Sequence, residues 1–252
     1  QPRGKTLGGS SGINAMVYIR GHRWDYDHWA ALGNPGWSYD DVLPYFRKSE
    51  NNETHADEFH GKGGPLNVAE LRTGNPLQET FLDAAREAQM PMTTDFNGAK
   101  QEGCGVYQAT QINGERCSAA RGYIHPYIGK RPNLFVQTGA QVVRILFEGK
   151  RAVGAEFQVG DQKKTVRARR EVIVAGGAFG TPQLLMLSGV GDSAALQKVG
   201  VTPVHHLPGV GLNLQDHPDF AFGYKTDSLD ALGYSFKGIA KLLGEIKRYR
   251  AE

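Results

Sequence analysis

The sequence EVIVAGGAFGTPQLLMLSGVG, residues 171–191, decides the fold class, because it predicts a strand, a glycine turn and a helix in succession. Glu171–Ala175 is a nearly continuous apolar run, which is typical of a strand buried on both faces. Gly176–Gly180 supplies the turn, Thr181-Pro182 begins the helix, and Ser188-Gly189 ends it. Doubly wound folds use such a unit to direct a helix N-terminus at a phosphate. We therefore predict an α/β nucleotide-binding sheet.

The same stretch contains an incomplete dinucleotide fingerprint of the type G-x-G-x-x-G. Gly177 and Gly180 match its second and third glycines, but Ala175 stands in place of the first. An NAD-binding fold also requires an acidic residue about 20 positions later. The run Val201–Val204 leads instead into His205-His206. The pattern therefore argues against the first strand of an NAD-binding fold. It favours a strand that comes later in the chain of some other nucleotide-binding sheet.

The preceding residues predict an antiparallel meander of short strands joined by tight turns. The expected strands are Leu134–Gln137, Val142–Phe147, Ala152–Val159 and Thr165–Arg169. Earlier in the chain, Ser38 and Asn75-Pro76 are expected to cap the starts of two helices.

Composition excludes several classes of protein. The 252 residues include 29 Lys or Arg and 26 Asp or Glu, a net charge of +3, which is too small for an electrostatic nucleic-acid binder. No apolar run approaches the ~18 residues of a membrane span, and no signal sequence is visible. The two cysteines, Cys104 and Cys117, predict neither a disulfide framework nor a metal site. A reducing, cytoplasmic compartment is therefore expected.

A second glycine loop lies near the start of the sequence, at residues 4–14 (GKTLGGSSGIN). Gly8 and Gly9 allow a ligand to approach the backbone closely, and Ser10 and Ser11 add hydroxyl groups. The loop does not have the residue order of a P-loop. By itself it is consistent with a simple turn or with a cradle for a pyrophosphate or a planar ring.

Three motifs carry a resemblance to a known family. GKTLGGSSGINAMVYIR (4–20), GTPQLLMLSGVG (180–191) and PGVGLNLQDH (208–217) resemble, in order, signatures of the glucose–methanol–choline (GMC) family of FAD-dependent oxidoreductases. The resemblance implies an FAD-binding, Rossmann-like doubly wound sheet with a β-meander, accompanied by part of a substrate-binding domain. It also implies that the first loop lies along the flavin, that Val142 meets the adenine end and that Ala175–Gly177 returns beneath the cofactor. The expected cofactor-binding residues are Leu7, Gly8, Gly9, Ser10, Asn14, Ala15, Met16, Val17, Val142, Ala175, Gly176, Gly177, Asp216 and His217.

The implied reaction is hydride transfer from the CH–OH carbon of an alcohol, or of a choline-type substrate, to flavin N5, while a histidine accepts the hydroxyl proton. Some relatives tether the flavin through a His where this sequence has Ile13, so FAD is expected to bind non-covalently. The family's G-x-G-x-x-G unit and its catalytic histidine segment are absent from residues 1–252. We therefore expect an internal fragment with no catalytic residue of its own, inactive alone and weak in FAD binding.

The resemblance also suggests a division into segments. Residues 1–52 would form the flavin loop and a lid, 53–133 part of the substrate-side domain, 134–225 the FAD-binding domain, and 226–252 a truncated return to the substrate side. Two alternative functions stay open: a hydroxynitrile lyase of the same family, and a non-catalytic flavoprotein remnant. The particular alcohol and the electron acceptor are not determined.

Other side chains receive structural interpretations. His55 and His60 lie five residues apart, a spacing unlike common metal motifs, so no metal site is expected. The Trp24–Trp37 aromatic residues are interpreted as packing of a lid. The basic amphipathic segment Leu229–Glu252 is interpreted as a core-packing helix, with attachment to an anionic inner-membrane surface as the alternative.

Overall fold

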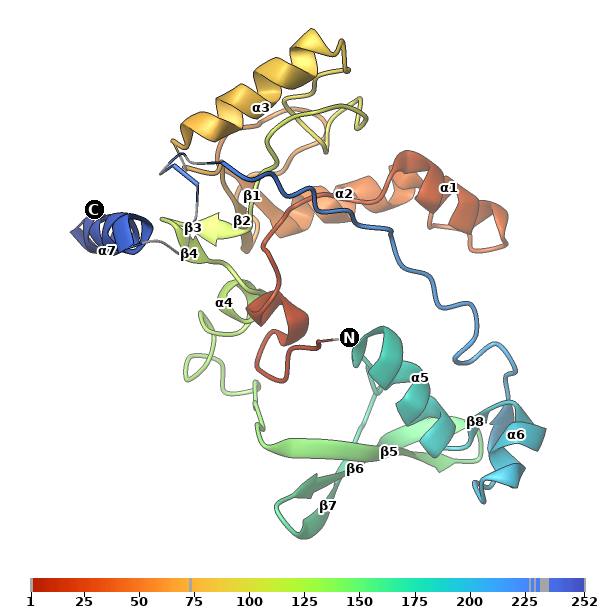
Figure 1. Cartoon of the computed structure of the whole chain (residues 1–252). Coiled ribbons are helices and arrows are strands. Elements are labelled where there is room, and N and C mark those ends of the chain that lie inside the picture. The colour runs from red at the N-terminus through yellow and green to blue at the C-terminus, as the bar shows by residue number, and fades with distance from the viewer. Residues whose placement is uncertain (1, 73, 227, 229, 232–235, 252) are drawn as a thin grey trace. The chain divides into compact units, whose positions relative to one another are not determined.

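The computed structural model describes residues 2–72, 74–226, 228, 230–231 and 236–251. The chain divides into two compact units, Gln1–Phe135 with Tyr224–Glu252, and Val136–Gly223 (Figure 1). Each unit is described separately.

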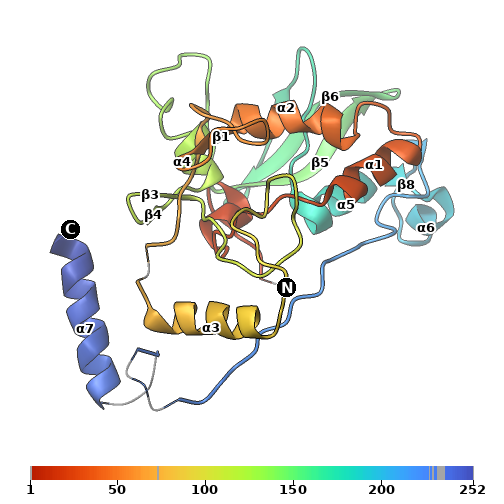
Figure 2. The same cartoon turned by 90° about the horizontal axis from the view of Figure 1, so that it is seen from above.

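Short elements joined by long loops make up the first unit (Figures 1 and 2). In chain order they are the 3₁₀ helix η1 (Gly9–Gly12), α1 (Arg23–Ala31), α2 (Tyr39–Ser49), β1 (Glu50–Asn52), β2 (Leu66–Val68), α3 (Pro76–Glu87), β3 (Gln111–Ile112), β4 (Glu115–Arg116), α4 (Ala119–Tyr123) and α7 (Phe236–Ala251). Strands β1 and β2 pair in parallel, and β3 and β4 form an antiparallel pair. Leu232, which the sequence placed in the last helix, lies outside the described residues.

Local side-chain chemistry explains where the helices of this unit begin. Ser38 Oγ accepts the Asp41 N–H, while the Asp41 carboxylate accepts the Ser38 N–H, a capping box that fixes the start of α2. Asn75 Oδ1 accepts the Leu77 N–H at 2.9 Å, and Pro76 is the first residue of α3. Both predicted helix starts are confirmed.

The aromatic residues around α1 pack on one another and on α2. Tyr26 makes edge-to-face contacts with Trp29 and Phe46, at centroid separations of 5.5 and 5.6 Å. Trp29 in turn contacts Trp37 at 5.8 Å. These contacts agree with a packing role, although Trp24 stays 63% exposed and stacks only on His28 within the described residues. The lid function of this segment stays a prediction.

A three-stranded meander and a helix dominate the second unit. Its elements are β5 (Ala140–Glu148), β6 (Arg151–Val159), β7 (Gln162–Arg167), α5 (Gly177–Leu187), β8 (Val190–Gly191), α6 (Ser193–Lys198) and β9 (His205–His206). The sheet order β5-β6-β7 is antiparallel throughout, which confirms the predicted meander. Ser188, at the end of α5, accepts the Ile145 N–H at 2.8 Å and so ties the helix to the buried side of β5.

Two predicted strands are wrong. Leu134–Gln137 and Glu171–Ala175 have no strand partner among the described residues, and Phe135 and Ile173 are 89% and 81% exposed. A strand buried on both faces requires neighbouring strands and covering helices, which local apolar character cannot supply. The helix after the glycine turn also begins at Gly177 rather than at Thr181, with Pro182 inside it.

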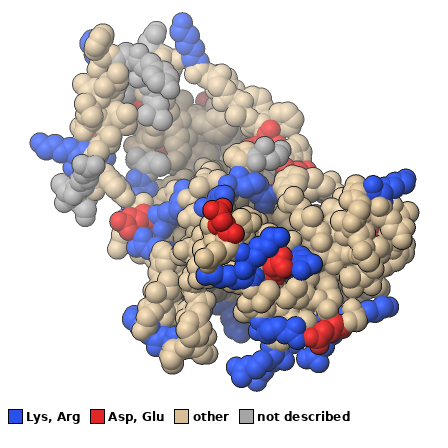
Figure 3. All heavy atoms as spheres, turned by 90° about the horizontal axis from the view of Figure 1, so that it is seen from below, with Lys and Arg blue, Asp and Glu red and all other residues tan. Residues whose placement is uncertain are grey.

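None of the helices in the described residues is both long and apolar enough to traverse a lipid bilayer. On the face shown in Figure 3, Lys and Arg side chains are more prominent than Asp and Glu side chains. Strand β7 contributes to the exposed charge of the second unit through Lys163, Lys164 and Arg167.

Candidate functional site

The first glycine loop is a tight structure supported by α4. Gly8 and Gly9 have φ values of 84° and 56°, which favour glycine, and they lead directly into η1. Ser11 Oγ donates to the Gly8 carbonyl at 2.5 Å and accepts the Ala119 N–H at 2.9 Å. The Ser11 hydroxyl therefore joins the loop to the first turn of α4, a support that the sequence did not reveal.

Close backbone contacts account for two glycines of this loop, Gly4 and Gly8. A Cβ on Gly4 would lie 2.2 Å from the Gly9 carbonyl oxygen, and a Cβ on Gly8 would lie 2.9 Å from the Ala120 nitrogen. A Cβ on Gly9, by contrast, would have no protein atom within 4 Å. The loop is thus packed on one side and open at Gly9, where a ligand has access to the backbone.

The residues after η1 are held by Arg116. The guanidinium of Arg116 donates to Asn14 Oδ1 at 2.7 Å and to the Ser11 carbonyl at 3.1 Å. Asn14 Oδ1 also accepts the N–H of Met16, which adopts a positive φ of 64°. Arg116 was not among the predicted site residues, because only the fold brings it next to Asn14.

Met16 and Val17 join the loop to the segment around Ala109 and Thr110 in the first unit. Met16 accepts a hydrogen bond from the Thr110 N–H at 2.9 Å, and Val17 forms an antiparallel bridge with Ala109. Ala15 is exposed. The predicted flavin-contacting run from Leu7 to Val17 therefore forms one continuous, partly exposed edge in the first unit.

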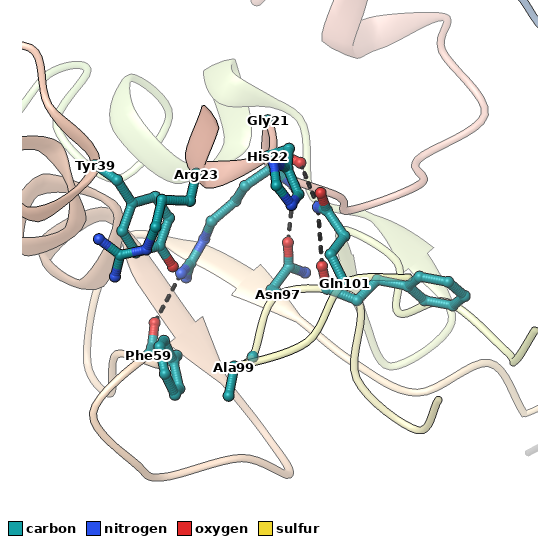
Figure 4. A pocket seen from close by; sticks show the side chains of 11 residues that line it. Gly21, His22, Arg23, Tyr39, Phe59, Asn97, Ala99 and Gln101 are labelled. Atoms are coloured by element: carbon teal, nitrogen blue, oxygen red, sulfur yellow. Dashed lines mark hydrogen bonds between the residues drawn. The ribbon is translucent and has the colours of Figure 1, made fainter. Parts of the chain in front are cut away.

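Arg20, three residues after this run, lines a pocket of 140 Å³ (Figure 4). Its backbone N–H donates to Asn97 Oδ1 at 2.7 Å, its guanidinium donates to the Phe59 carbonyl at 2.7 Å, and its carbonyl accepts from Gln101 Nε2 at 2.8 Å. These contacts join three loops that are far apart in the sequence.

A buried acid neutralises Arg20. Glu50, which is fully buried, accepts from Arg20 at 2.8 Å and from the Gly61 N–H at 2.7 Å. Asn52 donates to the other carboxylate oxygen at 3.0 Å. Because the positive charge is already paired, we interpret this pocket as part of the support of the loop and not as an anion site. Burial raises the pKa of the neighbouring Tyr18, and the positive charge of Arg20 opposes that rise only in part.

The second glycine turn lies in the other unit. Gly176 is the N-cap residue of α5 and has no side chain with which to cap it, and Gly177 has a φ of 79°. Thr181 Oγ1 accepts the Gly176 N–H at 3.0 Å. Ala175 and both glycines are exposed, so the start of α5 is accessible in this unit.

The remaining predicted residues of the second unit are also exposed. Val142 lies in β5 opposite Phe157, beside a β-bulge, and is 39% exposed. Asp216 and His217 lie in an extended segment, where the Asp216 side chain accepts the N–H of His217 at 3.0 Å. That these two residues are not a catalytic dyad stays a prediction.

His60, which the sequence pairs with His55 only by their spacing, is buried. Its ring nitrogen Nδ1 lies 2.8 Å from Asp57 Oδ1, and the ring of His55 contacts it at a tilt of 31°, with centroids 4.8 Å apart. Partial burial acts to raise the pKa of Asp57, but the hydrogen bonds from His60 and from the Phe59 N–H outweigh it and hold that pKa below its usual value.

Comparisons with known proteins identify relatives of the chain. Residues 1–219 match the family model described as GMC oxidoreductase. The mitochondrial choline dehydrogenase of Mus musculus is 50% identical over 216 residues, which are 86% of this chain and 36% of that protein. The oxygen-dependent choline dehydrogenase of Vibrio vulnificus is 49% identical over 225 residues, 88% of this chain and 40% of the relative.

Solved structures show the same architecture. An FAD-dependent oxidoreductase from Chaetomium thermophilum superposes with a TM-score of 0.78 at 34% identity, covering 82% of this chain and 38% of that one. Pyridoxine 4-oxidase from Mesorbium loti gives a TM-score of 0.76 at 32% identity, covering 82% and 41%. The chain thus spans less than half the length of these relatives. The likeness confirms the predicted fold class.

Proposed function

Because the chain belongs to the GMC oxidoreductase family, we propose that this protein is an FAD-dependent oxidoreductase that acts on the CH–OH group of a choline-type alcohol. The observation that carries the proposal is the 50% identity, over 216 residues, to a choline dehydrogenase. The matched region includes the first glycine loop, the meander and the second glycine turn.

The first loop fits a flat cofactor. Its backbone is open at Gly9, where no protein atom occupies the space that a side chain would enter, and the neighbouring Ile13 is 53% exposed. Ser11 and Arg116 fix the loop in this shape through the hydrogen bonds described above. A preformed edge of this kind binds a ligand without an ordering cost in the loop.

Cofactor-binding residues are proposed in each unit, taken separately. In the first unit the residues proposed to hold FAD are Leu7, Gly8, Gly9, Ser10, Asn14, Ala15, Met16 and Val17. In the second unit they are Val142, Ala175, Gly176, Gly177, Asp216 and His217. FAD, when bound, supplies the redox chemistry by accepting hydride at N5.

We propose that the cofactor is held without a covalent bond. Ile13, which stands where some relatives have a tethering histidine, has a hydrocarbon side chain and no nucleophilic atom. The part of this chain is to bind and orient the cofactor, and none of the residues 1–252 is proposed as the base that accepts the substrate proton. The substrate is a small alcohol, and nucleic acid is not a proposed partner.

The test begins with the protein expressed from its complete coding sequence. Acid precipitation should release flavin into the supernatant, and choline should reduce an artificial electron acceptor. Flavin that stays in the pellet would refute non-covalent binding. Cleavage of a cyanohydrin without acceptor reduction would refute the oxidoreductase assignment.

A matched pair of variants tests the role of the loop. Gly9 and Gly33 both have positive φ, 56° and 98°, and open space around the missing Cβ, so substitution strains both backbones, that of Gly33 at least as much as that of Gly9. Gly9→Leu should lower flavin content at least tenfold, whereas Gly33→Leu should keep it. Equal flavin content in the two variants would show that the loop does not contact the cofactor.

A further inference from the structure

Two loops of the first unit gather histidine and aspartate side chains away from the glycine loop. Donor atoms of His55, Asp57 and Asp95 all lie within 4.8 Å of one another. His55 and Asp57 follow β1, and Asp95 lies in the loop after α3. Only the fold brings them together, since Asp95 is far from the other two in the sequence.

His60 lies against this cluster and is 2% exposed. Its Nδ1 is 2.8 Å from Asp57 Oδ1, and its Nε2 is 3.6 Å from Asp95 Oδ1, too far for a hydrogen bond. Its ring also contacts the ring of His55 at a tilt of 31°, with centroids 4.8 Å apart. The imidazole is therefore fixed between two carboxylates.

Two buried nitrogens at this place have no hydrogen-bond partner in the described residues, namely Nε2 of His55 and Nε2 of His60. A carboxylate accepts hydrogen bonds only, so the proton of a neutral His60 ring lies on Nδ1, facing Asp57. The lone pair of Nε2 then faces the Asp95 carboxylate, which is unfavourable unless a positive charge lies between them. His55 Nε2 lies 4.0 Å from Glu70 Oε1, which is also beyond hydrogen-bonding distance.

We propose that His55, Asp95 and Nε2 of His60 bind a divalent transition-metal cation of the zinc type, and that Asp57, which is hydrogen-bonded to the opposite nitrogen of the His60 ring, orients that ring. Imidazole nitrogen together with carboxylate oxygen suits zinc and its first-row neighbours better than Mg²⁺ or Ca²⁺, which prefer oxygen alone. The hydrogen bond from His60 Nδ1 to Asp57 is the contact that usually orients a metal-binding histidine.

The cation would brace the segment that follows the glycine loop. Asn97, two residues after Asp95, accepts the Arg20 N–H at 2.7 Å and donates to the Tyr18 carbonyl at 2.9 Å. Joining the Asp95 loop to His55 and His60 would therefore restrain Tyr18 and Arg20 as well. This role is structural and independent of the redox reaction.

The experiment measures zinc binding by the whole protein after treatment with a chelator. Isothermal titration with ZnCl₂ at pH 7 should show one equivalent bound, and the melting temperature should rise with zinc but not with MgCl₂. Asp95→Asn, which keeps an oxygen acceptor for the Asn97 N–H, and His55→Ala should each weaken zinc binding at least tenfold. His125→Ala, at an exposed histidine outside the cluster, is the matched control and should bind zinc as the parent does.

A proton on His60 is the competing source of positive charge. ¹⁵N NMR of the imidazole rings distinguishes the two, because zinc shifts the Nε2 resonances of His55 and His60, whereas an imidazolium carries a proton on both nitrogens. A His60 ring that stays doubly protonated with excess zinc would overturn the proposal. Zinc binding that is equal in the parent, Asp95→Asn and His125→Ala proteins would overturn it too.

Discussion

Glu50→Gln should destabilise the first unit strongly, because it removes the charge that compensates buried Arg20. The side chains of Glu50 and Arg20 are 0% and 3% exposed, and their nitrogen–oxygen distance is 2.8 Å. Glutamine keeps one acceptor oxygen but presents an NH₂ group where the other carboxylate oxygen accepts from Asn52. An uncompensated buried charge of this kind costs about 3–5 kcal/mol.

That magnitude is a large share of the ~5–15 kcal/mol by which domains are stable, so it is readily measured. In urea denaturation we expect the midpoint to fall with an unchanged slope. Glu115→Gln is the control, because Glu115 pairs with Arg121 at 2.6 Å but the two side chains are 63% and 36% exposed. The control should lose no more than about 1 kcal/mol. A loss of that size in Glu50→Gln as well would refute the view that the buried pair holds this unit together.

Three further predictions concern the loop and its support. Gly8→Ala should cost more stability than Gly9→Ala, since both have positive φ but only a Cβ on Gly8 meets the Ala120 nitrogen, at 2.9 Å; equal shifts in melting temperature would contradict this. Ser11→Ala removes one hydrogen bond within the loop, to the Gly8 carbonyl, and one between the loop and α4, from the Ala119 N–H. It should cost about 1–3 kcal/mol in urea denaturation, a loss that Ser11→Thr should partly restore. Burial raises the pKa of Tyr18, so its contribution to stability is complete below the unfolded value near 10 and is lost as the pH rises through the higher folded value. Tyr18→Phe should therefore flatten the loss of stability above pH ~10, and an unchanged alkaline slope would count against the assignment.

Local chemistry made several features readable from the sequence. Ser38 and Asn75-Pro76 fix helix starts because capping groups act on N–H groups two or three residues away. The turns at Gly149 and Gly160, with φ values of 59° and 57°, set the meander, since a tight turn allows only antiparallel neighbours.

The order of the motifs also predicts the family, and the family match confirms it. The three motifs span residues 4–217, and the family match covers residues 1–219. The individual cofactor contacts expected from these motifs stay predictions.

Features that depend on distant residues were beyond the reach of the sequence. Glu171–Ala175 has the composition of a buried strand, but it is unpaired in the described residues because burial requires neighbours that the run itself does not contain. Arg116 and Ala119 support the first loop through contacts across about a hundred residues of chain. Likewise Asp95 joins His55 and His60 only when the fold closes. Caps, turns and motifs depend on residues that are close in the sequence, so the sequence predicts them. Burial, and clusters of side chains from distant segments, arise only when those segments pack together.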